Sequence, residues 1–315
     1  MAPWLLSHHY IKELCLLIAA VISYIFGLMT NFFIIGVSAI DRLKGRPLTP
    51  ADLLITAIAT SRIIFQLVTL FDIYWKTFIA EYSPAVYTAI YWFGSSSVFS
   101  NIWFSVLQSV FYSLKISNFH NDFFLYLKKT ISQRVLGLSV AFVLLSTFYP
   151  SAEFVAEFMM IIPKNSTQVD GNFRLVPFMF YILFLLMNIL PFLFYAVSCF
   201  ALLGSLFHHM YRMRRENNVS GHLDAYIKTV KFTIVSFWCF ALYVICNIFG
   251  KYFLGFLGCF LVANCFLVLH SMYLIYMTAR LRGRLLKILH GLTKYLAPNK
   301  GSLSKSGLEV QTVSH

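Results

Sequence analysis

Few side chains in this chain of 315 residues could do chemistry, and no catalytic pattern joins them. The sequence contains no HExxH, CxxC, GxSxG or P-loop glycine motif. The chain has two pairs of adjacent histidines, His8-His9 and His208-His209. Two neighbouring residues of a helix point in different directions, so the two histidines of a pair cannot bind the same metal ion. We therefore expect no enzymatic activity, no metal site and no other cofactor.

Polar residues deep inside apolar stretches give a sharper signal. Arg62, Asn31 and His270 each lie ten residues from the nearest charged residue at the end of their own apolar stretch. Ser271 lies beside His270. At about 1.5 Å of rise per residue, a helix would place them about 15 Å deep, near the centre of a bilayer of about 30 Å. Because an arginine at that depth costs from about 2.5 to more than 10 kcal/mol, Arg62 must face other helices and find acceptors there.

We expect a polar lock, formed by Asn31, Arg62, His270 and Ser271, that joins the first, second and seventh helices. No acidic residue lies at this depth, so amides, carbonyl groups or water would balance the guanidinium. The alternative is a static packing device that takes no part in switching.

Such positions require membrane-spanning helices, and the composition predicts them. The chain is 59% apolar and 12% charged, whereas soluble domains are roughly 45–50% apolar and about 25% charged, so a water-soluble globule is excluded. Continuous apolar runs also exclude a β-barrel, whose strands alternate apolar and polar residues. We expect an all-α membrane protein, a bundle of seven transmembrane helices within residues 13–279. The spans are expected at about 14–40, 53–75, 84–114, 135–156, 177–208, 230–250 and 252–279.

Basic residues decide the orientation, because Lys and Arg collect in the cytoplasmic segments of membrane proteins. With the amino terminus outside, nineteen of the 25 basic residues fall in inside segments and five in outside segments. Residues 1–12 are then extracellular and the carboxyl terminus is cytoplasmic. The first span, rather than a cleaved signal peptide, would direct insertion. Because the membrane explains the basic charge, we expect no nucleic-acid partner.

The segments outside the spans carry further signals. Asn165 begins an Asn-Ser-Thr acceptor for glycosylation in the longest outside loop. The six cysteines lie in or near spans, so we expect no disulfide framework. Leucines three or four residues apart, with basic residues between them, predict an amphipathic helix in the inner membrane interface at residues 280–297. A disordered cytoplasmic tail is expected at 298–315.

The outer ends of the predicted helices are rich in aromatic residues with a few polar groups, which is the lining that a pocket for small, largely apolar molecules needs. Asp72, about one turn below the outer face, could pair with a ligand amine, or could simply reach the water. With 33 Phe and 18 Tyr in the chain, plain packing is the alternative role for the aromatic candidates. The candidate ligand residues are Asp72, Tyr91, Trp92, Ser95, Phe99, Phe180, Phe184, Tyr243, Asn247, Phe260 and Asn264.

Motifs in the cytoplasmic halves or adjoining loops of six of the seven predicted helices occur in the order found in one receptor family. The strongest is SVFYSLKISNF at residues 109–119, followed by FLYLK at 124–128. Others are NFFI at 31–34, ADLLIT at 51–56, ATSRI at 59–63, LPF at 190–192, SLFHHMYRM at 205–213 and HSMYLI at 270–275. With these motifs the chain resembles the type 2 taste receptors, the bitter receptors, which are seven-helix receptors coupled to heterotrimeric G proteins.

The resemblance implies a mechanism and a location. A bitter compound would bind in the outer vestibule and favour a state whose inner helix ends open to a G protein of the gustducin or inhibitory class, in the plasma membrane of sensory cells. Tyr112 and Pro191 would join the polar lock in activation, and Tyr243 would match the switch tyrosine of the family. Basic residues on the inner side would hold anionic lipid and meet the G protein, unless they are positive-inside charges alone. These residues are Lys115, Lys128, His209, Arg212, Lys231 and Arg280.

The chain also departs from the family pattern at three places, one of which is the third inner loop, where the usual R-D-P-S is missing. Thr278-Ala279 stands where the family has an Asn before its K-L-K, and Gly94 stands where many members carry a ligand-stacking Trp. One alternative is a pheromone receptor of the first vomeronasal type, which also has short termini. The other is a transporter or channel, although such proteins have internal repeats and ionisable residues along a path.

Overall fold

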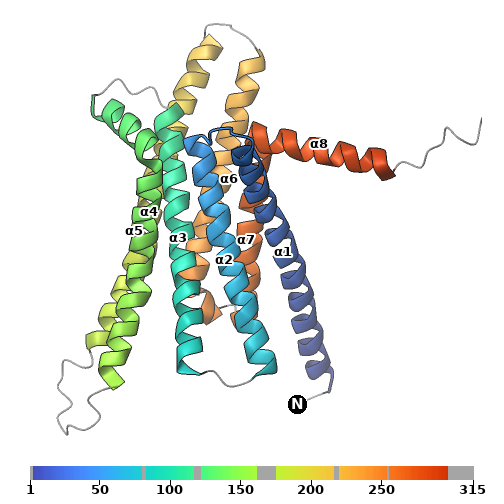
Figure 1. The fold of residues 1–315 in the computed structure, drawn as a ribbon, viewed down its shortest axis with the longest axis vertical. Helices are drawn as coiled ribbons and strands as arrows, with labels where there is room; N and C mark the ends of the chain where they lie inside the picture. The colour runs from blue at the N-terminus through green and yellow to red at the C-terminus, as the bar shows by residue number, and fades with distance from the viewer. Residues whose placement is uncertain are drawn as a thin grey trace, which may run out of the picture. The chain divides into compact units, whose positions relative to one another are not determined.

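The computed structural model describes residues 3–79, 83–116, 122–161, 175–215, 220–253 and 255–296, and every regular element within them is a helix. The chain divides into two units, residues 1–273 and residues 274–315. The helices, drawn in Figure 1, are α1 (Pro3–Leu43), α2 (Pro50–Phe78), α3 (Pro84–Ile116), α4 (Asp122–Ile161), α5 (Leu175–Arg215), α6 (Ser220–Phe253), α7 (Gly255–Met277) and α8 (Ala279–Leu296).

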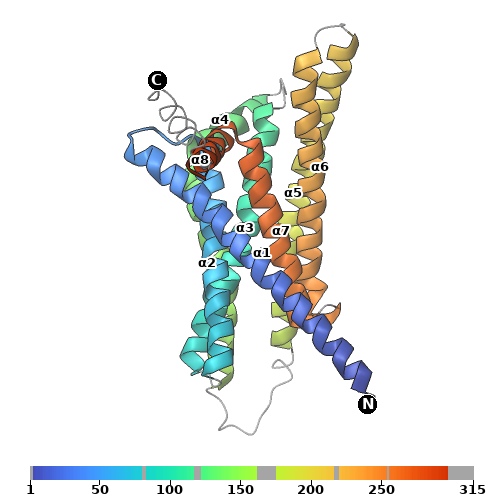
Figure 2. The same cartoon turned by 90° about the vertical axis from the view of Figure 1, so that its right-hand side faces the viewer.

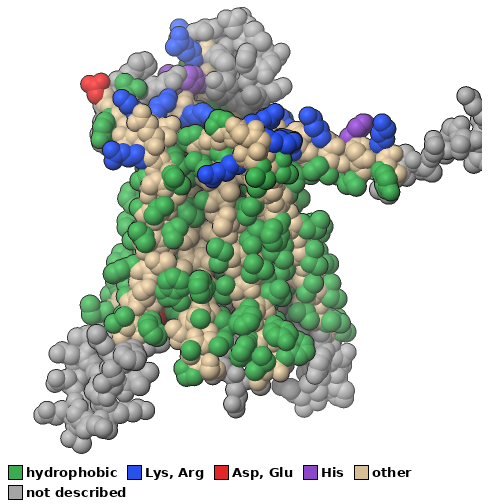
Figure 3. All heavy atoms as spheres, in the orientation of Figure 1, with side chains coloured by type: hydrophobic (Ala, Val, Ile, Leu, Met, Phe, Trp, Pro, Cys, Tyr) green, Lys and Arg blue, Asp and Glu red, His purple; other side chains and the backbone are tan. Residues whose placement is uncertain are grey.

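The predicted fold class, an all-α bundle of membrane-spanning helices, is confirmed. By length and composition α1, α2, α4, α5 and α6 each contain a segment able to cross a membrane, and α7 with α8 forms a further bent candidate, within the described residues. The third helix is less apolar because serines and amides line its buried face. Hydrophobic side chains cover the flanks of the first unit, and Lys and Arg side chains gather at the end where α1 stops and α2 starts (Figure 3).

Most helices extend beyond the predicted spans. The first helix already begins at Pro3, so most of the segment 1–12, predicted to be an extracellular terminus, is part of α1. The fourth begins at Asp122 and has non-helical dihedral angles at Arg134 (φ −109°, ψ 19°), directly before the predicted span start at 135. Charged residues mark the predicted span ends, but they do not stop a helix, since its backbone hydrogen bonds continue outside the bilayer.

Local signals set individual helix ends. Thr49 caps α2: its Oγ1 accepts from the backbone N of Asp52 at 3.2 Å, and the Asp52 carboxylate accepts from the backbone N of Thr49 at 3.1 Å. This reciprocal pair is a capping box, and Pro50 at the first helical position has the backbone angle that a helix needs. Past the end of α1, Gly45 adopts a positive φ of 72°, which glycine tolerates best.

The core of the first unit lies around α3, which packs against α2, α4 and α5. A hydrophobic cluster draws Phe99 from α3, Tyr149 from α4, Tyr195 from α5 and Tyr243 from α6 into one contact group. Figure 2 shows α5 and α6 running side by side, and the two helices pack against each other. The third helix therefore connects most of the elements that carry candidate residues.

The second unit contains α8, which has two distinct faces. Along this helix Lys and Arg side chains point to one side and hydrophobic side chains to the other (Figure 3). Leu286, Leu289 and Leu292 are about half exposed. This is the pattern of a helix that lies in a membrane interface, the role that the sequence predicts for residues 280–297.

Candidate functional site

A buried arginine lies at the centre of a hydrogen-bond network between helices. Arg62, on α2, is 0% exposed. Its Nε donates to Oδ1 of Asn101 on α3 at 2.9 Å. Its Nη1 donates to Oγ of Ser271 at 2.7 Å and to the backbone oxygen of Leu267 at 3.3 Å, both on α7. Its Nη2 lies 2.9 Å from Nδ1 of His270, and because a guanidinium only donates, that Nδ1 must be the unprotonated ring nitrogen.

The network reaches α1 through a serine hydroxyl. Ser271 donates to Oδ1 of Asn31 at 2.8 Å, and Nδ2 of Asn31 donates to the backbone oxygen of Gly27 at 2.8 Å. We call this set the Arg62 network: Asn31, Arg62, Asn101, His270, Ser271 and the Leu267 carbonyl. The structure thus brings together the four residues of the predicted polar lock and adds a fourth helix, α3.

The acceptors in the Arg62 network are all neutral. In the described part of the chain no carboxylate contacts the guanidinium, which is held by an amide, a hydroxyl, an imidazole and a carbonyl group. A hydrogen bond to a charged group contributes about 1.5–3 kcal/mol, so four of them offset much of the cost of burying the cation. This answers the question of the counter-charge that the sequence left open.

Sequence reasoning missed Asn101. It lies 15 residues before the end of α3 at Ile116, at the same depth in its helix as the residues of the polar lock. An amide in the middle of a span is the signal that could have found it. The aromatic residues and serines near the outer end of the same helix gave a stronger signal for a site there.

A ladder of rings connects α6 to the Arg62 network. The Tyr243 and Phe266 ring centroids lie 4.9 Å apart, and those of Phe266 and His270 lie 5.8 Å apart. Tyr243 is 4% exposed and packs in the core cluster. A displacement of Tyr243 would therefore change the packing around His270, one of the four partners of the arginine.

Tyr91 and Trp92, both candidate ligand residues, turn toward α4. The Tyr91 hydroxyl donates to Oε2 of Glu153, and Nε1 of Trp92 donates to Oγ of Ser151 at 2.9 Å. Ser95 lies beside the Tyr91 hydroxyl. Glu153 is not among the site residues predicted from the sequence, although it lies within the predicted span 135–156, which is part of α4.

Phe99 and Phe184 meet in the core rather than in an open vestibule. Their ring centroids lie 6.3 Å apart, and that of Tyr149 lies 5.4 Å from Phe99 and 6.0 Å from Phe184. Phe180 packs against the same cluster. Asn247 on α6 donates through Nδ2 to Oδ1 of Asn188 on α5 at 2.6 Å, a partner that sequence reasoning did not single out.

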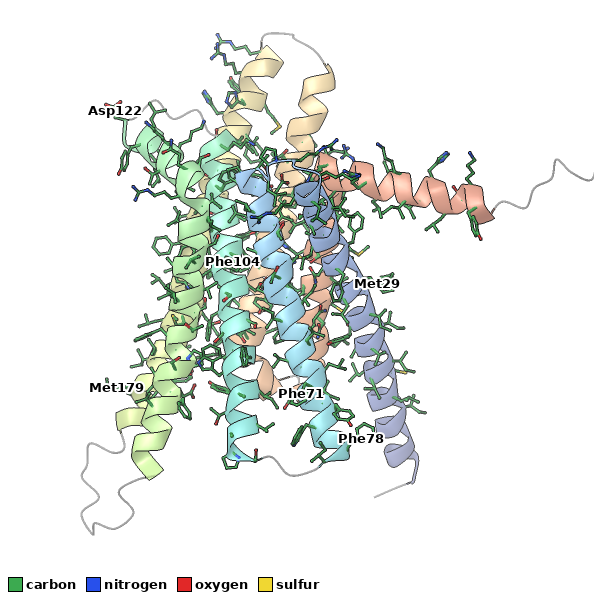
Figure 4. All side chains as sticks on the ribbon, in the orientation of Figure 1. Met29, Phe71, Phe78, Phe104, Asp122 and Met179 are labelled. Atoms are coloured by element: carbon green, nitrogen blue, oxygen red, sulfur yellow. The ribbon has the colours of Figure 1, made fainter. Side chains whose placement is uncertain are left out.

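The remaining ligand candidates are scattered. Asp72 is half-buried on α2, in the half of that helix where Figure 4 labels Phe71 and Phe78. Asn264 is fully buried on α7. Asn165 and the side chain of Phe260 lie outside the described residues. Among the described residues, Asp72 therefore lies on α2 and Asn264 on α7, and the role of the candidate ligand residues stays a prediction.

A family model described as "Taste receptor protein (TAS2R)" matches residues 9–293. The chain belongs to the type 2 taste receptor family. Among its relatives, it is 30% identical over 274 residues to taste receptor type 2 member 119 of Rattus norvegicus, covering 82% of this chain and 79% of that receptor. It is 29% identical over 282 residues to member 105 of Mus musculus (84% and 93% covered) and 32% identical over 248 residues to member 10 of Papio hamadryas (75% and 78% covered).

The family match includes the whole Arg62 network, since residues 9–293 contain Asn31, Arg62, Asn101 and Ser271. This type 2 taste receptor is thus a multi-pass membrane protein in which a buried cation ties α1, α2, α3 and α7. Tyr112 and Pro191 lie outside the network. The ring of Tyr112 packs edge-on against Phe111, with centroids 5.8 Å apart, and Pro191 is buried inside α5.

The basic residues predicted to meet a G protein lie on α3, α4, α5, α6 and α8 of this taste receptor. Lys115 and Lys128 are exposed and adjacent, because Nζ of Lys128 donates to the backbone oxygen of Lys115 at 3.4 Å. Arg212 and Lys231 are exposed, and His209 is half-buried. Arg280 belongs to the second unit, at the start of α8.

Proposed function

We propose that this chain is a bitter taste receptor: a G protein-coupled receptor that binds small, largely apolar bitter compounds at the outer end of its helices. It activates a heterotrimeric G protein of the gustducin or inhibitory class from the plasma membrane of sensory cells. The observation that carries the proposal is the Arg62 network, which ties four helices together inside a chain that belongs to the type 2 taste receptor family.

The neutral partners of Arg62 make the network suited to switching. A ligand shifts an equilibrium between two states only by its differential affinity for them, and typical coupling free energies are about 1–3 kcal/mol. Losing one of these bonds costs about 1.5–3 kcal/mol, and exchanging one neutral acceptor for another costs less, because a new bond replaces the old one. A small tastant can therefore supply the free energy that one such exchange requires.

The tastant acts through the core aromatic residues. A ligand at the outer ends of α3 and α6 would press on Phe99 or Tyr243, and the ring ladder Tyr243–Phe266–His270 ends at the guanidinium. Asp72, on the outer part of α2, is the candidate partner for a ligand amine. In this proposal the amino terminus faces outside, since the end of the first unit that carries Lys and Arg is the cytoplasmic one.

The cytoplasmic end carries the partner surface. Lys115, Lys128, Arg212 and Lys231 present exposed positive charge at the inner ends of α3, α4, α5 and α6. Opening of these ends would expose that surface to the G protein, while anionic lipid would hold it in the resting state.

The test is a screen of a chemically diverse bitter panel on cells that express the full chain with a promiscuous G protein and a calcium reporter. We expect concentration-dependent responses to a subset of the panel and none in cells without the receptor. Silence across the panel at normal surface levels would contradict the proposal. Responses to volatile pheromones alone would move the chain toward vomeronasal receptors, and ligand-independent ion flux in liposomes would favour a channel.

A further inference from the structure

A cleft between α3 and α4 contains a carboxylate among aromatic rings. Its walls include Tyr87, Tyr91 and Trp92 from α3 and Glu153 and Phe154 from α4. Tyr87 is 54% exposed and Phe154 45%, so the cleft opens at the surface of the bundle. It is separate from the Arg62 network and shares only Tyr91 and Trp92 with the predicted ligand residues.

The carboxylate of Glu153 keeps acceptor capacity for a ligand. Its contacts within the described residues are tyrosine hydroxyls: Tyr91 donates to Oε2, and Tyr149 lies beside the same group. No Lys or Arg of the described chain forms an ion pair with it. A carboxylate has about four lone-pair positions, so two hydroxyl partners leave room for a further donor.

A hydrogen bond joins the two helices that form the cleft. The bond from Trp92 Nε1 to Oγ of Ser151 fixes α3 against α4 at 2.9 Å, and Ser151 donates in turn to the backbone oxygen of Thr147 at 2.7 Å. Tyr149 continues from the carboxylate into the core, where its ring meets that of Phe99 with centroids 5.4 Å apart. An occupant at Glu153 would therefore lie beside a tyrosine whose ring packs against Phe99 in the core.

We propose that this cleft binds the ammonium group of a cationic amphiphile, a protonated or quaternary amine on an apolar body. Aromatic faces attract such cations, and a carboxylate among them supplies the opposite charge. A hard metal ion is a poorer match, because it needs several oxygen ligands, and among the described residues no group of three side chains could hold one. The exposed rings of Tyr87 and Phe154 would receive the apolar body. The inference rests on the proposed receptor function, to which it adds a site for charged ligands.

The test measures binding to the purified full-length receptor in lipid discs. The probes are tritiated benzyltriethylammonium and its neutral carbon analogue, in which a quaternary carbon replaces the nitrogen. Glu153→Gln should weaken binding of the ammonium probe by about 10- to 100-fold, the effect of losing a partner of a charged group, and leave the neutral analogue within about twofold. Asp122→Asn, which removes an exposed carboxylate at the first turn of α4 (Figure 4), should change neither affinity.

A second variant covers the case in which Glu153→Gln fails to fold. Tyr87→Leu removes an exposed ring and should weaken the ammonium probe by about two- to fivefold without affecting the neutral analogue. Equal losses for both probes, or no loss in either variant, would overturn the proposal.

Two sources of the ammonium group are separated by the lipid. With the anionic share of the disc held constant, the neutral lipid is either phosphatidylcholine or a galactolipid. Equal probe affinity in both assigns the cleft to soluble amines, whereas weaker binding in phosphatidylcholine assigns it to the choline headgroup. Ammonium binding that needs Glu153, in a receptor that no bitter compound activates, would support this site while the proposed function fails.

Discussion

Replacing Asn101 with leucine removes the acceptor of the Nε–H of Arg62 and leaves that donor buried without a partner. The bond is 2.9 Å long and both residues are almost completely buried. Because a hydrogen bond to a charged group contributes about 1.5–3 kcal/mol, Asn101→Leu should lower the free energy of unfolding by about that amount. Asn101→Asp keeps an oxygen at the same place and adds a negative charge, so it should retain the stability of the wild type or exceed it.

The assay is a denaturant titration of the purified receptor in lipid discs, with Asn247→Leu as the matched control. Asn247→Leu also removes an amide hydrogen bond, the one of 2.6 Å to Asn188, but the partner that it leaves is neutral. The control should therefore lose only about 0.5–1.5 kcal/mol. The reasoning is refuted if Asn101→Leu is no more costly than Asn247→Leu, or if Asn101→Asp is as unstable as the leucine variant.

Three further substitutions follow from the same contacts. Arg62→Ala removes four hydrogen bonds and strands their buried acceptors, so surface delivery or signalling should be lost in a flow-cytometry and calcium assay; normal surface levels with an unchanged dose–response would count against it. Asp72→Asn should raise the half-effective concentration of cationic agonists more than that of neutral ones, and equal shifts would remove Asp72 from the ligand site. Gly27→Leu should cost about 1–3 kcal/mol of stability, since a Cβ there would overlap Nε2 of Gln66 and lie 3.2 Å from Cγ2 of Val268; a thermal midpoint like that of wild type would contradict the packing.

The helices were predictable because a bilayer imposes a simple rule. A segment without charges and about 20 residues long has to span, and its backbone has to be helical. The depth rule also worked on Asn31, Arg62 and Ser271, which the structure joins by hydrogen bonds, because a buried cation leaves few choices of partner. The ends of the helices were harder to predict, because a charged residue does not mark where a helix stops. For example, α4 begins at Asp122, far from the predicted start of its span.

The ligand side was harder to predict because aromatic side chains are not specific. The sequence predicts that Tyr91 and Trp92 line a ligand pocket, and in the structure they line the cleft between α3 and α4, where they hydrogen-bond to α4. The direction in which they point depends on the rotation of α3 about its axis. Phe99 was chosen for the same pocket and lies buried beside Tyr149. Sequence depth gives the height of a residue in the membrane but not the side of the helix that it occupies, so the contact between Tyr91 and Glu153 could not be foreseen.

The orientation of the chain in the membrane is the claim on which the tastant site and the G protein surface both depend. An epitope tag placed after His315, with a second tag before Met1, tests it on cells that express the full chain. Antibody to the first tag should stain only permeabilised cells, while the second tag should be stained on intact cells. Staining of the tag after His315 on intact cells would contradict the account, since the basic helix ends would then lie outside.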